Sequence, residues 1–113
     1  MDTIPVRTFK FAIRIIELTS KLPRTSTGMA ISNQIVRSGT SVGANVEEAQ
    51  NSASKKEFIH GMTIALKEAR ETYYWLRLLG ESSVLPGQED LIKENLEIIK
   101  ILTSSVKRAK TKV

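Results

Sequence analysis

The one residue pair whose spacing suggests metal chemistry is Glu57 and His60, in a segment that we expect to be helical. Di-iron four-helix bundles use this Glu-x-x-His spacing, but they need two such pairs and two further carboxylates. The chain has a single histidine, so a second pair cannot exist within one subunit. Glu57 also ends a Ser-Lys-Lys-Glu sequence typical of a helix capping box, which gives its carboxylate a structural role. The sequence therefore predicts no metal site and no cofactor.

Nucleophilic catalysis finds equally little support. The chain has no cysteine, and His60 is the only imidazole that could act as a base. Gly39 and Gly43 lie four residues apart inside an expected helix, a spacing that favours close helix packing over a phosphate-binding loop. We therefore predict no catalytic residues and a protein that is not an enzyme.

The composition is that of one small domain, spanning residues 1–113. Seventeen basic and twelve acidic residues leave a net charge of +5, which permits nucleic-acid binding and also favours solubility. The apolar N-terminus is interrupted by Arg7, Lys10 and Arg14, so it does not resemble a signal peptide or a membrane span. We expect a cytoplasmic protein without membrane contact.

Helix start and stop signals divide the chain into four helices, at about 5–22, 26–50, 54–79 and 88–110. Pro5 suits a first helical position and Pro23 ends the first helix. Ser54 opens the third helix and Gly80 is expected to stop it. Because the connections are short, we predict an all-α, antiparallel up-down-up-down four-helix bundle.

The first helix carries two apolar stripes on opposite faces. Phe9, Ile13 and Ile16 form one stripe, and the other lies 160–180° away at about 100° per residue. An edge helix of a monomeric bundle needs only one such face, so the second indicates self-association. The residues alone do not decide which stripe is core. We assign to the interface the second stripe and the outlying apolar residues of the third helix: Phe11, Ile15, Leu18, Leu22, Ile64, Trp75 and Leu78.

The fourth helix has a simpler pattern. We expect its core face to consist of Leu91, Ile92, Leu96, Ile99, Leu102, Val106 and Ala109.

Basic residues make the most specific functional pattern. Arg7, Lys10, Arg14 and Lys21 fall in one sector of the first helix, together with Glu17. A second cluster closes the chain, with Lys107, Arg108, Lys110 and Lys112. Phosphate backbones are attracted to such clusters largely without regard to sequence. We predict that RNA or DNA binds at Arg7, Lys10, Arg14, Lys21, Lys107, Arg108 and Lys110; the alternative is an ordinary solvated surface.

Four polar residues lie along one flank of the second helix: Arg37, Ser41, Asn45 and Glu48. We interpret them as a structural polar seam, in which Asn45 fixes helix register and Glu48 pairs with Arg37 or with a lysine of the third helix. The alternative is a ligand-binding role for Asn45 and Glu48.

The stretch QIVRSGTSVGANVEEAQ, followed by SKKEF, resembles a pattern found in proteins encoded within intervening sequences of bacterial large-subunit ribosomal RNA genes. Two positions depart from that pattern, Glu47 for alanine and Ala49 for glycine. The resemblance implies a four-helix bundle that forms a ring, with a pentamer favoured. It also implies a fold-level relation to the pentameric accessory proteins of diversity-generating retroelements. The residues that match are Gln34, Ile35, Arg37, Ser41, Val42, Asn45, Val46, Glu48, Ser54, Lys56, Glu57 and Phe58.

Two non-enzymatic functions follow from these patterns. The first is a homo-oligomer that binds nucleic acid, with structured RNA as the favoured ligand. The alternative is a scaffold or accessory subunit that binds a partner protein and no nucleic acid.

Overall fold

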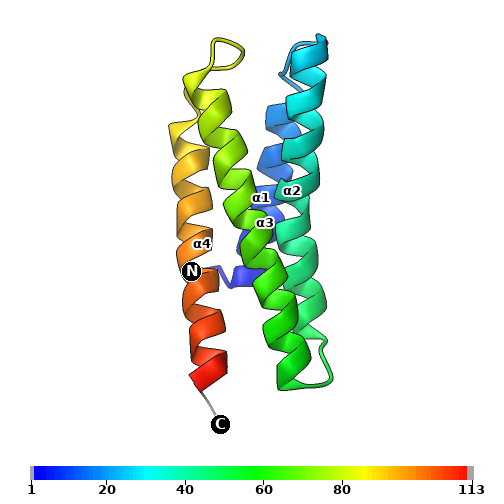
Figure 1. The fold of residues 1–113 in the computed structure, drawn as a ribbon, viewed down its shortest axis with the longest axis vertical. Helices are drawn as coiled ribbons and strands as arrows, with labels where there is room; N and C mark the ends of the chain where they lie inside the picture. Colours follow the sequence, from blue (N-terminus) through cyan, green and yellow to red (C-terminus); the bar gives the residue numbers. More distant parts are fainter. Residues whose placement is uncertain (1, 112–113) are drawn as a thin grey trace.

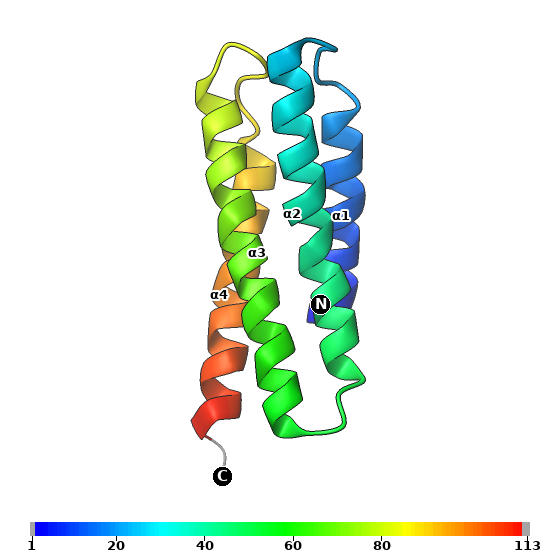
Figure 2. The same cartoon turned by 45° about the vertical axis from the view of Figure 1, so that its right-hand side comes forward.

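Four antiparallel helices form an elongated bundle measuring 49 × 21 × 21 Å (Figures 1 and 2). The computed structural model describes residues 2–111, and its helices are α1 (Ile4–Thr19), α2 (Ser26–Gln50), α3 (Lys55–Glu81) and α4 (Glu89–Thr111). Each helix packs against the next, and α1 also contacts α4, which closes the bundle. The predicted all-α fold is confirmed. α1 is the shortest helix and begins partway along the bundle, so one end is built by α2, α3 and α4 alone (Figure 2).

Side-chain caps explain where α2 and α3 begin. The Thr25 hydroxyl accepts a hydrogen bond of 3.0 Å from the Gly28 amide, and α2 has the predicted bounds. The Ser54 hydroxyl accepts one of 3.1 Å from the Glu57 amide. The Glu57 carboxylate in turn accepts from the Ala53 amide at 3.2 Å, one residue before the usual position in a capping box.

Two helix ends differ from the sequence prediction. α1 ends at Thr19, because the amides of Lys21 and Leu22 bond to carbonyls only three residues back and tighten the chain into a turn before Pro23. α3 continues through Gly80 to Glu81. Gly80 is instead a point of close approach, since a Cβ there would lie 2.5 Å from the Gly87 carbonyl oxygen.

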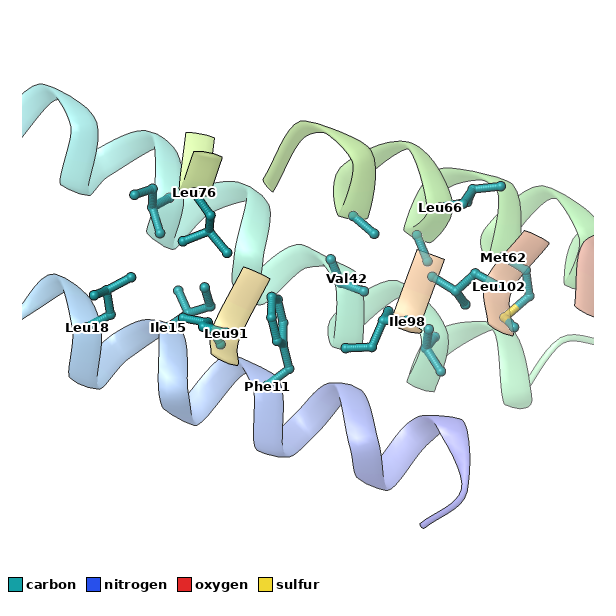
Figure 3. Packing of buried hydrophobic residues seen from close by; sticks show 14 of the residues in the cluster. Phe11, Ile15, Leu18, Val42, Met62, Leu66, Leu76, Leu91, Ile98 and Leu102 are labelled. Carbon is teal, nitrogen blue, oxygen red and sulfur yellow. The ribbon is translucent and has the colours of Figure 1, made fainter. Parts of the chain in front are cut away.

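The core of the bundle settles which stripe of α1 faces inward. Phe11, Ile15, Leu18 and Leu22 are buried, and Figure 3 shows the first three projecting between the helices. Their assignment to a subunit interface was therefore wrong. The exposed stripe consists of Val6, Phe9, Ile13 and Ile16.

Glycines of α2 provide the physical reason for that orientation. A Cβ on Gly39 would lie 2.8 Å from the Ile15 side chain, and one on Gly43 would lie 3.1 Å from the Thr8 carbonyl oxygen. The predicted close-packing role of the two glycines is confirmed. Because α2 has no side chain at these positions, α1 can seat Ile15 fully in the core.

The core face of α4 is rotated from the one predicted. Asn95 and Ile98 are fully buried, whereas Ile92, Leu96 and Ile99 are only partly buried. The Asn95 side-chain amide donates a hydrogen bond of 3.1 Å to the Ala69 carbonyl of α3. This tertiary contact holds a polar residue inside the bundle, which apolar periodicity alone cannot indicate. The observed core face is Leu91, Asn95, Ile98, Leu102 and Val106.

Candidate nucleic-acid interface

The basic edge of α1 is partly neutralised within the subunit. The Arg7 guanidinium donates two hydrogen bonds to the Glu94 carboxylate of α4, at 2.7 and 2.8 Å. Both side chains are about three-quarters buried, and the bond to Glu94 raises the pKa of Arg7 above its usual range. Arg7 therefore fastens α1 to α4 and has little of its charge free for a phosphate.

Lys10 lies one turn further and is more open. Its ammonium group donates a hydrogen bond of 2.9 Å to the Asp2 carboxylate, and both side chains are well exposed. This bond, followed by the charge of the same lysine, holds the pKa of Asp2 below its usual value. An exposed pair of this kind exchanges partners easily.

Arg14 and Lys21 are exposed and have no ion-pair partner within residues 2–111. They line a hollow of about 360 Å³ between α1 and the start of α4, together with the carboxylates of Glu17, Glu89 and Asp90. The hollow therefore has charges of both signs, and its acidic side chains oppose phosphate binding.

The strongest concentration of positive charge lies in the second half of α4. The twelve basic residues before Ile98 are balanced by all twelve acidic residues of the chain. The net charge of +5 therefore belongs entirely to residues 98–113, which contain five basic residues and no acidic one. Lys107, Arg108 and Lys110 are exposed, whereas Lys100 reaches back to Glu97 at 3.6 Å; Lys112 lies outside the described residues.

The fold adds two lysines to this end of the bundle. The turn from α2 to α3 lies at the same end as the last turn of α4 (Figures 1 and 2), so Lys55 and Lys56 join the cluster there. Both are exposed. The sequence reasoning missed them, although the predicted antiparallel topology was the signal that could have found them. We call Lys55, Lys56, Lys107, Arg108 and Lys110 the basic end.

The two predicted clusters do not form one surface within a subunit. Arg7 lies beside Glu94, and Lys107 follows Glu94 by thirteen residues, which is about 20 Å along a helix. Lys21 lies further away in the opposite direction, beside the start of α4.

The predicted polar seam is solvent-accessible. The Ser41 hydroxyl and the Asn45 amide donate to carbonyls of their own helix, at 2.6 and 2.8 Å, and Glu48 is exposed. Arg37 donates to Glu68 at 3.3 Å, to Glu71, and to the side-chain oxygen of Gln34 at 3.1 Å, so Glu48 is not among its partners within residues 2–111. Glu48 was expected to pair with Arg37 or with a lysine of the third helix, and within residues 2–111 it forms neither ion pair, because Arg37 reaches across to α3 instead.

Buried polar contacts lie at other residues. Ser38 and Thr72 meet between α2 and α3, and Asn95 bonds from α4 to α3. Of the remaining residues predicted for an interface, Trp75 is half-buried and donates its indole N–H to Glu71 at 3.0 Å. Ile64 is half-buried and Leu78 is exposed.

Within residues 2–111, no three histidine, cysteine, aspartate or glutamate side chains cluster in a way that could hold a metal ion. His60 is exposed at the start of α3. Among the described helices, none combines the length and apolar character needed to cross a membrane.

Comparison with known proteins identifies the family. Residues 4–104 match the family described as 23S rRNA-intervening sequence protein. A crystal structure of a protein of unknown function from the S23 ribosomal protein family of Bacteroides thetaiotaomicron VPI-5482 is similar, with a TM-score of 0.87 and 39% identity. The alignment covers 93% of this chain and 99% of that one. No curated protein matches the chain. This chain belongs to the 23S rRNA-intervening sequence protein family.

Proposed function

We propose that this protein is a non-enzymatic homo-oligomer of the cytoplasm that binds structured RNA through the basic end of each subunit. The observation that carries the proposal is the charge distribution, because a body of zero net charge carries all five excess positive charges on residues 98–113. The fold places Lys55 and Lys56 at the same end.

The side chains of the basic end are better suited to binding the phosphate groups of a nucleic acid than its nucleobases. Its exposed side chains are lysines and one arginine, on a helix terminus and a turn, with no aromatic residue among them. Such groups bind the backbone and release its counterions, largely without regard to sequence. The same cations also interact favourably with the negative, C-terminal end of the α4 dipole, so part of their role is to stabilise the helix.

Oligomerisation makes a small basic end effective. One subunit offers only a few phosphate contacts, but several subunits in a ring would present them together to one ligand. The apolar stripe of α1 that the core leaves exposed, Val6, Phe9, Ile13 and Ile16, supports self-association. We take five subunits as the working number, as the sequence resemblance implies.

Fluorescence anisotropy with a structured RNA and with a duplex DNA, at several salt concentrations, tests the proposal. A Lys107→Gln, Arg108→Gln, Lys110→Gln variant should weaken binding to every sequence. Each lost phosphate contact should flatten the slope of log affinity against log salt by about 0.7–0.9. The matched control changes three exposed cations elsewhere, Arg24, Arg70 and Lys93, to glutamine and should bind much more nearly like the wild type.

A third variant separates the two clusters. Changing Lys10, Arg14 and Lys21 to glutamine should have a smaller effect than changing the basic end, because Lys10 is paired and acids surround the other two. If wild type binds neither ligand at low salt, or if the control variant loses as much affinity as the basic-end variant, the proposal fails.

A partner protein is the second candidate, and one surface favours it. Tyr74 and Leu78 of α3 are 51% and 43% exposed, and the Tyr74 ring meets Trp75 edge-to-face at 5.1 Å. Exposed aromatic and aliphatic residues are common in protein interfaces. The scaffold function would lead if the protein bound no nucleic acid and co-purified with another protein at this surface.

A further inference from the structure

The outer face of α1 is a ridge of large apolar side chains that nothing within residues 2–111 covers. Val6, Phe9, Ile13 and Ile16 are 44%, 59%, 44% and 56% exposed. We call these four residues the ridge. Lys10 borders it on one side and Glu47 of α2 on the other, around a hollow of about 340 Å³.

A groove lies on a different face, between the second half of α2 and the first half of α3. Its volume is about 620 Å³, and its lining includes Ala49, Gly61 and Ile64. The two helices approach closely here, because a Cβ on Gly61 would lie 3.0 Å from the Ala49 Cβ. Glu48 lies on the α2 rim, and Lys56 and His60 lie on the α3 rim.

We propose that the groove of one subunit receives the ridge of a second copy of this chain. The lengths agree, since the ridge spans residues 6–16 and the α3 side of the groove spans residues 54–64, each about 15 Å at 1.5 Å per residue. The shapes also agree, with bulky side chains on the ridge and small residues at the groove floor.

Charged residues at the edges of the two surfaces determine the orientation of the ridge in the groove. The ridge has a cation on one edge, Lys10, and an anion on the other, Glu47. The groove has an anion on one rim, Glu48, and on the other rim the cation Lys56 beside Glu57, whose carboxylate already accepts a hydrogen bond from the Ala53 amide. Glu47, Glu48 and Lys56 have no ion-pair partner within residues 2–111, and Lys10 is held only by the exposed Asp2, a pair that exchanges partners easily, so all four charges are available to a second subunit. One orientation forms an ion pair at each edge of the contact. It places Lys10 of the ridge opposite Glu48 of the groove, and Glu47 opposite Lys56.

Because the ridge and the groove are different surfaces, the contact is head-to-tail. A head-to-tail contact gives a closed ring when its rotation closes and an open filament when it does not. The inference rests on the self-association in the proposed function and adds which two surfaces meet.

Mixing two defective proteins tests this arrangement. The ridge variant carries Phe9→Glu and Ile13→Glu and keeps an intact groove. The groove variant carries Glu48→Lys and Ile64→Glu and keeps an intact ridge. Light scattering should show each variant alone as a monomer of about the 12.6 kDa subunit mass. An equimolar mixture should form a dimer of twice that mass, because one productive contact remains.

Several outcomes would overturn the inference. They are a monomeric wild type at 50 µM, an oligomeric ridge or groove variant, and a mixture that stays monomeric while both variants keep the wild-type circular dichroism spectrum. Should Ile64→Glu unfold the half-buried position, Glu48→Lys alone serves as the groove variant, and Lys10→Glu on the other subunit should restore its assembly.

Cross-linking gives an independent reading without disturbing the fold. The chain has no cysteine, so Phe9→Cys and Ile64→Cys proteins each carry one thiol. A short bismaleimide should join them in a mixture, whereas Phe9→Cys with the exposed control Arg70→Cys should give little product. Equal yields from both mixtures would contradict the proposed contact.

Failure of this inference and failure of RNA binding give different results. The ridge variant alters none of the five cations of the basic end, so anisotropy of this variant at low salt reports RNA binding separately from assembly. Loss of assembly with residual salt-sensitive binding supports both proposals, and wild-type assembly in the ridge variant refutes only the contact described here.

Discussion

The hydroxyl groups of Ser38 and Thr72 lie 2.9 Å apart in the core, between α2 and α3. Ser38 donates to the Gln34 carbonyl at 3.0 Å. Thr72 has one hydrogen to share between Ser38 and the Glu68 carbonyl, which lies at 2.8 Å. Each hydroxyl therefore has a partner within its own helix, and the bond between them is an addition.

The first prediction follows from that shared hydrogen. Thr72→Val keeps the shape and leaves Ser38 bonded to Gln34, so it should lower the free energy of unfolding by only about 1 kcal/mol. Urea denaturation measures this, with Thr63→Val at an exposed site as the control. A loss above about 3 kcal/mol would mean that Ser38 is left without a partner.

The second prediction concerns Asn95, whose Oδ1 atom is buried without a hydrogen-bond partner within residues 2–111. Asn95→Leu removes this orphaned atom along with the bond to Ala69, so stability should change little. Asn95→Asp should cost about 3 kcal/mol at pH 7, because it places a carboxylate beside the Ala69 carbonyl with no donor to meet it.

The effect of pH on the aspartate variant checks the cause. Burial raises the pKa of a carboxyl group, so the folded variant retains its proton at a higher pH than the unfolded chain does. Its destabilisation should therefore shrink as pH falls from 7 towards 5. Thermal melts of the aspartate variant and of Asn95→Leu at both pH values check this. A difference between the two variants that is the same at pH 7 and pH 5 would indicate a purely steric cause, since a steric loss is independent of pH.

The third prediction is a coupling between Arg7 and Glu94. The pair is bidentate and mostly buried, so a double-mutant cycle with Arg7→Met and Glu94→Gln should give a coupling of about 1 kcal/mol. The cycle is measured by urea unfolding at low salt and at 0.5 M salt. A coupling that vanishes in salt would place the pair in bulk solvent, contrary to its burial.

The fourth prediction concerns the pKa of Asp2, which Lys10 lowers. Because this pKa is lower in the folded state, the pair adds stability above the ordinary aspartate pKa and loses it as pH falls through the folded value. Lys10→Met should raise the pKa of Asp2 towards its ordinary value, as measured by NMR titration of the carboxyl carbon. An unchanged titration would show that the two side chains do not interact in solution.

The sequence predicted the topology and most helix bounds because these depend on local signals. Thr25 and Ser54 cap their helices through atoms three residues away, and prolines act on their own turn. Which stripe of α1 faces the core could not be predicted from the residues of α1, because both of its stripes are apolar and similar in length. The deciding features are Gly39 and Gly43 on a neighbouring helix, which admit one stripe only after the helices meet.

The candidate site was only partly predictable for a related reason. Arg7 belongs to the basic sector of α1 by spacing, but the bundle brings Glu94 to it from 87 residues away. Lys55 and Lys56 join the C-terminal cluster only when α3 and α4 lie antiparallel. Charge along the sequence is therefore a poor guide to charge on the surface until the helix ends have been placed together.

The position of the excess charge has a consequence for how the molecule moves. A neutral body with the exposed cations Lys107, Arg108 and Lys110 near one tip of a 49 Å rod carries an electric dipole moment directed along its long axis. A polyanion at a distance exerts a torque on such a rod as well as an attraction. The subunit will therefore turn as it approaches a negatively charged strand, so that its basic end makes the first contact.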